Sequence, residues 1–151
     1  MARFNFRLQS VLNIRTSLEE QQRLEFAAAR KRLDEEEERL EALKVRKAEY
    51  EEEGRRLRDD SLNVKDIIDN ETAIERIKEY IEAQIARVRK AEEDLETERI
   101  KLVDAMRERK TYERLREKAF EEFIAEENHK EGVENDEHNS FVYGQRQLNG
   151  E

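Results

Sequence analysis

Residues 64–105 read VKDIIDNETAIERIKEYIEAQIARVRKAEEDLETERIKLVDA, and this stretch decides the fold. Six large apolar residues follow one another at intervals of seven: Ile67, Ile74, Ile81, Val88, Leu95 and Leu102. An apolar period of seven, sustained over several heptads, is the pattern of a coiled coil. Most of the remaining positions are charged, as the solvent-exposed positions of such a helix require. The stretch therefore predicts a long helix with a narrow apolar seam.

The same register includes a second set of seam positions and continues toward the C-terminus. The alternate seam positions hold Ile77, Ala91, Ala105, Tyr112 and Ala119, interrupted by Asn70, Gln84 and Glu98. Phe123 resumes the first seam position after Arg109 and Arg116. We therefore expect one helix over about 64–131.

A second heptad pattern occupies the first third of the chain and predicts a helix over about 6–57. Its seam positions hold Leu8, Leu12, Phe26, Ala29, Leu33, Leu40, Leu43, Lys47, Tyr50 and Leu57. The seam is imperfect, since Arg15, Glu19, Gln22 and Glu36 also fall on it. Val11 and Leu18 flank the seam at its start. They indicate either extra contact area near the N-terminus or an apolar stripe that drifts relative to the heptad, because a straight helix has 3.6 rather than 3.5 residues per turn.

The stretch GRRLRDDSLN, residues 54–63, separates the two patterns. Gly54 weakens a helix by about 1 kcal/mol relative to Ala, and Asp, Ser and Asn favour turns and helix caps. We expect the break between the two helices to lie within Gly54–Asn63, with a turn over about 58–63 and a cap formed by Asn63 and Asp66.

Two long helices with a short connection pair antiparallel. With the turn near residue 60, residue i should lie opposite residue 120 − i, and both chain ends should lie at the same end of the hairpin. The predicted fold class is therefore all-α: a long antiparallel two-helix coiled-coil hairpin over 1–131. The period is lost after Glu127, and three of the four glycines follow it, so residues 132–151 are expected to form a fraying or disordered tail.

The composition narrows the classes of function. Charged residues make up 46% of the chain and the net charge is −9, with both signs interleaved, which disfavours nucleic acid as a partner. There is no Cys for a disulfide framework, no apolar run long enough to span a bilayer, and no signal-peptide pattern at the start. A cytoplasmic protein fits best.

No pattern of catalytic residues emerges. The phosphate-binding patterns GxxxxGK[ST] and GxGxxG are absent, and the two histidines, His129 and His138, do not share a helix face. The many carboxylates read as a solvated surface, since paired carboxylates perform acid–base chemistry only when burial separates their pKa values. We expect no enzyme, no cofactor, no metal and no small-molecule substrate.

Apolar side chains gather where the hairpin should be open. In the antiparallel arrangement, Phe4, Phe6, Leu8, Val11 and Leu12 meet Leu115, Phe120, Phe123 and Ile124. Aromatic residues exposed on a narrow hairpin would form a protein-binding end. Packing that seals the end of the hairpin explains them equally well, so both interpretations stay open.

Two motifs give the chain a family resemblance. The opening FNFRLQSVLNIR is similar to the start of the flagellar FliJ proteins, through Phe4, Phe6, Leu8, Gln9, Val11, Leu12, Ile14 and Arg15. ERKTYERLREKAFEEF, residues 108–123, resembles the second recurring stretch of that family, through Leu115, Arg116, Glu117, Lys118, Phe120 and Phe123. The stretch Asn135-Asp136-Glu137 is similar to an acidic pair near the C-terminus of the family.

The resemblance implies a component of the flagellar type III export apparatus, similar in fold to the central stalk subunit of rotary ATPases. Such a protein binds and stimulates the hexameric export ATPase, contacts the cytoplasmic domain of the export gate, and assists export chaperones. It is cytoplasmic, associated peripherally with the membrane at the flagellar base, and expected to be monomeric alone. The expected ring contacts are Phe4, Phe6, Leu8, Leu12, Arg15, Leu115, Arg116, Phe120 and Phe123. The gate contact aligns to Ala73 and Ile77.

Two other functions compete with this reading. A general coiled-coil scaffold would be a parallel dimer, which the break between the two heptad patterns disfavours. A helical export chaperone would bind unfolded export substrates rather than an ATPase ring.

Overall fold

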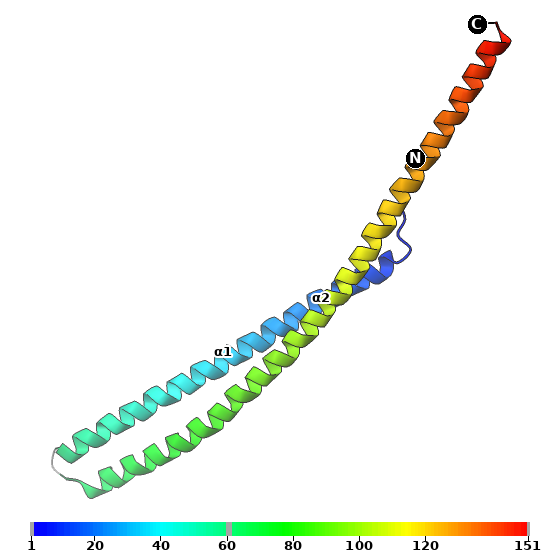
Figure 1. The fold of residues 1–151 in the computed structure, drawn as a ribbon. Coiled ribbons are helices and arrows are strands. Elements are labelled where there is room, and N and C mark those ends of the chain that lie inside the picture. Colours follow the sequence, from blue (N-terminus) through cyan, green and yellow to red (C-terminus); the bar gives the residue numbers. More distant parts are fainter. Residues whose placement is uncertain (1, 60–61, 151) are drawn as a thin grey trace. The chain divides into compact units, whose positions relative to one another are not determined.

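The computed structural model describes residues 2–59 and 62–150. Each of these two ranges consists mainly of one long helix. Helix α1 spans Gln9–Asp59 and helix α2 spans Val64–Leu148 (Figure 1). The described residues contain no strand. The predicted fold class, two long helices packed against each other, is confirmed.

Contacts divide the chain into two compact units. The hairpin unit is Glu20–Asp104, and the terminal unit combines Met1–Glu19 with Ala105–Glu151. Both units therefore take one part from α1 and one part from α2. Each unit has its own packing and is described by itself.

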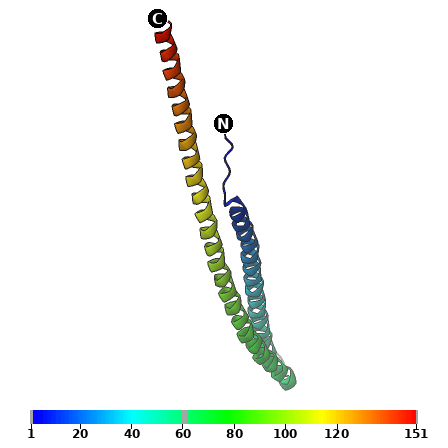
Figure 2. The ribbon, with the colours of Figure 1, turned by 90° about the vertical axis from the view of Figure 1, so that its right-hand side faces the viewer.

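The hairpin unit is antiparallel, and its register is the predicted one. The Gln22 amide donates a hydrogen bond to the Glu98 carbonyl at 3.3 Å, and the Gln84 amide donates one to the Glu36 carbonyl at 2.9 Å. The Asn70 amide donates to the Tyr50 carbonyl at 2.8 Å. All three pairs obey the 120 − i relation. Figures 1 and 2 show α1 in cyan and α2 in green running side by side in this unit.

The apolar core of the hairpin unit is a thin seam. Leu33, Val88 and Ala91 form its buried cluster, with Leu40 and Leu95 packed against them. Leu33 is 5% exposed, so even a two-helix packing removes an aliphatic side chain almost wholly from water. The burial of heptad positions explains why most other positions remain charged.

The break between the helices lies within the predicted stretch 54–63, but Gly54 is not part of it. Helix α1 continues to Asp59, and Gly54 is buried inside it. A Cβ atom placed on Gly54 would lie 2.5 Å from the side-chain oxygen of Asn70. The glycine therefore makes room for a polar side chain of α2 rather than for a chain reversal.

The start of α2 is capped as predicted. The side-chain oxygen of Asn63 accepts hydrogen bonds from the backbone N–H groups of Lys65, at 3.1 Å, and Asp66, at 3.4 Å. Of the residues expected to form the turn, Asp60 and Ser61 lie outside the described residues. The cap accounts for the position at which α2 begins.

The terminal unit differs from the prediction at both of its chain segments. Helix α1 begins at Gln9 instead of near residue 6, and Phe4 in the preceding non-helical segment contacts Phe120 of α2. Helix α2 continues to Leu148, through the residues for which a fraying or disordered tail was expected. Two helical glycines cost only about 1 kcal/mol each, and no proline interrupts the helix. Figures 1 and 2 show no segment beside this last part of α2, drawn orange to red.

Candidate functional site

The aromatic residues of the terminal unit pack against one another. The Phe4 ring meets the Phe120 ring edge-on, with centroids 5.2 Å apart and planes at 78°, and lies 5.4 Å from the Phe123 ring. The guanidinium of Arg116 lies over the Phe4 ring at 5.5 Å and donates a hydrogen bond to the Gln9 side chain at 2.9 Å. Phe4 therefore fastens the N-terminal segment to α2, as an edge-to-face ring contact does in a protein interior.

Charged residues on the seam of the terminal unit are paired across the two helices. Arg15 forms an ion pair with Glu108 and lies over the Tyr112 ring at 5.8 Å. Buried Glu19 accepts a hydrogen bond from Arg109, which also pairs with Glu113 at 2.7 Å. The hydrogen bonds with Glu113 and then Glu19 raise the pKa of Arg109 above its usual value. These charges replace apolar contacts in this part of the seam.

The expected ring-contact residues therefore separate into two groups. Phe6 and Leu12 are buried, Leu8 and Phe123 are half-buried, and Phe4, Arg15 and Arg116 are engaged in contacts within the unit. Leu115 and Phe120 remain 43% and 45% exposed. The packing interpretation thus accounts for most of the aromatic end, and the exposed pair is what it leaves over.

The structure adds exposed apolar residues that the sequence analysis did not select as contacts. Ile14 is 58% exposed, and Leu18 and Ile124 are also exposed. Val11, Ile14 and Leu18 follow the spacing of one helix face, which is the signal that could have identified them. Val11 and Leu18 are the residues that widen the apolar stripe in the sequence.

Basic side chains accompany this apolar surface on α2. Arg107, Lys110, Arg114 and Lys118 are exposed, and their side chains take part in no ion pair within the described part of the chain. The terminal surface is defined here as these four cations with Ile14, Leu18, Leu115, Phe120 and Ile124. These residues give the terminal unit exposed apolar side chains and four cations that form no ion pair within the described residues.

The residues aligned to the gate contact lie in a groove of the hairpin unit. Ala73 is half-buried, but Ile77 is 5% exposed and belongs to the seam. Two adjoining hollows of about 620 and about 460 Å³ share Leu43, Arg46 and Tyr80 and together form the arginine groove. Its lining residues are Arg39, Ala42, Leu43, Arg46, Tyr50, Asp69, Thr72, Ala73, Arg76, Ile77, Tyr80, Ala83, Gln84 and Arg87.

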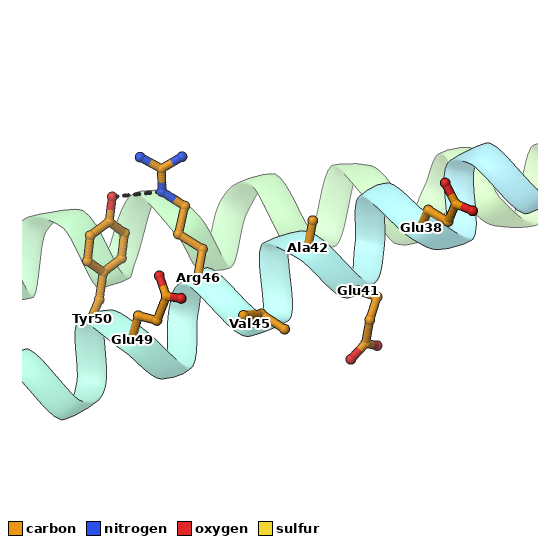
Figure 3. Close-up of a pocket in the computed structure, with 7 residues that line it drawn as sticks. All are labelled: Glu38, Glu41, Ala42, Val45, Arg46, Glu49 and Tyr50. Atoms are coloured by element: carbon orange, nitrogen blue, oxygen red, sulfur yellow. Dashed lines mark hydrogen bonds between the residues drawn. The ribbon is translucent and has the colours of Figure 1, made fainter.

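A further hollow of about 640 Å³ lies on the outer surface of α1 (Figure 3). Its residues all come from one helix, and three of them are the carboxylates Glu38, Glu41 and Glu49. The Arg46 guanidinium donates a hydrogen bond to the Tyr50 hydroxyl at 3.1 Å, drawn as the dashed line. The hollow is open to solvent and brings no nucleophile or acid–base pair together.

The described residues contain no group of three or more His, Cys, Asp or Glu side chains arranged to hold a metal ion. No helix in the described ranges is long and apolar enough to cross a membrane.

The comparisons with known proteins agree with the two sequence motifs. The family described as "Flagellar FliJ protein" matches residues 4–148, nearly the whole chain. No curated protein and no solved structure matches the chain. Because the match covers both helices and both end motifs, the chain belongs to the flagellar FliJ protein family, and this membership supports an export-related flagellar role.

Proposed function

We propose that this protein is a cytoplasmic component of the flagellar export apparatus that binds the export ATPase ring and stimulates it. The observation that carries the proposal is the terminal surface, where four cations without ion pairs within the described residues accompany exposed apolar side chains. An exposed apolar patch next to uncompensated charge is typical of a protein-binding surface.

Stimulation of the ATPase would follow from unequal contact between this protein and the subunits of the ring. A single narrow hairpin in a ring touches the subunits of the ring differently. Each subunit then shifts toward the conformation that binds the hairpin better, by the difference in binding free energy. The protein needs no active site for this effect, because catalysis belongs to the ring.

The test is the ATPase rate of the purified export ATPase with and without this protein. We expect stimulation by the wild type and its loss in the double variant Ile14→Ser/Leu115→Ser. The control is Leu24→Ser, which changes an exposed leucine of the hairpin unit and should leave stimulation intact. Absence of stimulation by the wild type, or equal stimulation by both variants, contradicts the proposal.

Phe4→Ala is a poor test of ring binding, although the motif makes it attractive. Phe4 contacts Phe120, Phe123 and Arg116 within the unit, so its removal loosens the fold. Loss of stimulation in that variant would report stability as much as contact. Thermal unfolding of every variant must therefore accompany the rate measurements.

The proposal includes a second contact, between the arginine groove and the cytoplasmic domain of the export gate. The family resemblance aligns this contact to Ala73 and Ile77. Since Ile77 is buried, the exposed neighbour Tyr80 is the better candidate for direct contact. We expect Tyr80→Ala to weaken binding of the gate domain and Tyr143→Ala, an exposed tyrosine of the terminal unit, to leave it unchanged.

Assistance to export chaperones and peripheral location at the cytoplasmic face of the flagellar base complete the proposal. Both rest on family membership. Co-sedimentation of the protein with membranes that carry the export gate, and its loss from membranes without the gate, tests the location.

A further inference from the structure

The charge of the arginine groove is opposite to that of the whole chain. Its lining includes four arginines, Arg39, Arg46, Arg76 and Arg87, and a single acidic residue, Asp69. The chain as a whole carries a net charge of −9. A positive strip on an acidic protein attracts a partner of negative charge and repels one of positive charge.

Most of this positive charge is uncompensated. Arg39 pairs with Glu36 at 2.7 Å. Arg46 contacts only the neutral hydroxyl and ring of Tyr50 among the described residues. The side chains of Arg76 and Arg87 form no ion pair within the described part of the chain. Carboxylates brought by a partner would find guanidinium groups available for charge-assisted hydrogen bonds.

The floor of the groove is apolar and made of small residues. Ala42, Ala73 and Ala83 line the groove together with Leu43 and Ile77, and Tyr80 in the same lining is 61% exposed. Small side chains let another backbone approach closely. The α2 residues of the groove lining extend from Asp69 to Arg87, about 27 Å of helix at about 1.5 Å per residue. That length suits a partner helix of about four to five turns.

The groove also has a direction. Its continuation toward Leu57 is a hollow of about 420 Å³ lined by Glu53, Asp66 and Asp69, with Tyr50 and Ala73. The charge therefore changes from acidic at this end to basic beside Arg39 and Arg87. This change of charge along the groove would orient a bound partner with its acidic part over the arginines.

We infer that the arginine groove binds an acidic amphipathic helix, with apolar residues against the alanine floor and carboxylates on Arg46, Arg76 and Arg87. The inference rests on the proposed gate contact and assigns the gate segment its chemistry. The carboxylates of Glu38, Glu41 and Glu49 on the adjacent surface of α1 (Figure 3) disfavour a long polyanion such as RNA, which would pass over them.

The first experiment measures binding of the purified gate cytoplasmic domain at about 50 and about 300 mM NaCl, where screening differs strongly. We expect Arg76→Glu/Arg87→Glu to weaken binding at least roughly tenfold at low salt and Arg76→Gln/Arg87→Gln to weaken it less. The matched control, Lys31→Glu/Arg89→Glu, makes the same charge change outside the groove and should bind as the wild type does. Thermal unfolding checks that all three variants are folded.

The second experiment does not depend on the gate. The probes are two designed helical peptides of about four turns with the same apolar stripe, one rich in Glu and one rich in Lys, and a single-stranded RNA. Binding of the Glu peptide to the wild type and the control variant, but not to Arg76→Glu/Arg87→Glu, supports the inference. No binding of the Glu peptide, equal binding of both peptides, or preference for RNA overturns it.

The two experiments separate the inference from the proposed function. Gate binding that is indifferent to Arg76→Glu/Arg87→Glu and to salt overturns the acidic helix and leaves the gate contact standing. Selective binding of the Glu peptide without any binding of the gate domain removes the gate as partner and leaves the chemistry of the groove standing.

Discussion

At the residue scale, Gly54 shows how a helix-weakening residue can be required inside a helix. The side-chain oxygen of Asn70 lies too close to Gly54 to leave room for a Cβ atom on residue 54. The Asn70 amide donates a hydrogen bond to the Tyr50 carbonyl. A larger residue would displace Asn70 from this position. The glycine therefore permits a buried polar side chain to keep its hydrogen bond.

Gly54→Ala tests this role. Alanine in an exposed helix normally stabilises relative to glycine by about 1 kcal/mol, but here we expect a loss of roughly 1–2 kcal/mol, because Asn70 must leave its carbonyl partner. Gly132→Ala is the control, since a Cβ there meets no described atom within 4 Å, and it should increase helicity. Chemical denaturation monitored by circular dichroism measures both. A more stable Gly54→Ala variant would contradict the assignment.

Glu19 and Arg109 provide a second case at this scale. Glu19 is buried on the seam, and Arg109 is its partner from α2. We expect Arg109→Leu to destabilise the fold by about 2 kcal/mol, because a buried carboxylate loses its partner across the seam. The double variant Glu19→Leu/Arg109→Leu should recover most of this loss, since two leucines suit a heptad seam. The denaturation midpoints of the two variants measure this difference in stability. An equal loss of stability in both variants would count against the Glu19–Arg109 pairing.

At the scale of the helices, polar contacts set the register of the hairpin unit. The Gln22–Glu98, Glu36–Gln84 and Tyr50–Asn70 contacts recur at every second heptad on both helices. Sliding one helix by a heptad would place the buried Gln84 amide against Leu43 or Ala29. An unpaired buried polar group costs about 1–3 kcal/mol, and the three contacts would be lost together. Leucines on the seam favour pairing in general, whereas these contacts select one alignment.

Engineered cysteines test this alignment. The 120 − i relation places Ala29 opposite Ala91, and both are buried. We expect Ala29→Cys/Ala91→Cys to form an intramolecular disulfide under mild oxidation, because opposing seam positions fall within disulfide reach. The chain has no other cysteine, so non-reducing electrophoresis and mass spectrometry are unambiguous. Ala29→Cys/Gln84→Cys, one heptad away, should remain reduced, and the opposite result would refute the register.

At the scale of the whole molecule, the two proposed contacts belong to different units. The terminal surface lies in the terminal unit, and the arginine groove lies in the hairpin unit. Coiled-coil seams bury little area, so a change on one exposed surface should leave the packing of the other unit intact.

This arrangement predicts separable functions. Ile14→Ser/Leu115→Ser should lose ATPase stimulation and retain binding of the gate domain, and Tyr80→Ala should do the reverse. Both activities are measured on the same preparations, with thermal unfolding as the check on folding. Joint loss of both activities in a fully folded variant would show that the two surfaces do not act separately.

Much of the fold could be predicted from the sequence because a heptad is a local code. The seam from Ile67 to Leu102 and the cap at Asn63 depend on neighbours within a few residues along one helix. The 120 − i relation needed only the position of the connection in addition. Local patterns did not reveal the close approach of Gly54 to Asn70, which is distant along the chain, or the extent of α2 through residues 132–148, where the heptad period is lost.

The candidate sites were predicted less completely. The end motifs indicated the right part of the chain, but composition could not distinguish an aromatic side chain that packs inward from one that faces solvent. Phe4 and Leu115 are apolar residues of the two end motifs, yet Phe4 is held by two rings and a guanidinium, while Leu115 remains exposed.

The sequence by itself determined two helices, their antiparallel register and the family, because heptad spacing and end motifs are properties of contiguous residues. Only the tertiary structure decided which apolar residues remain exposed and which charges gather in one groove. Arg39 and Arg87 are far apart along the chain and share a groove only because α1 and α2 are aligned by their polar seam contacts. Exposure and charge clustering depend on such distant pairs, which no local pattern specifies.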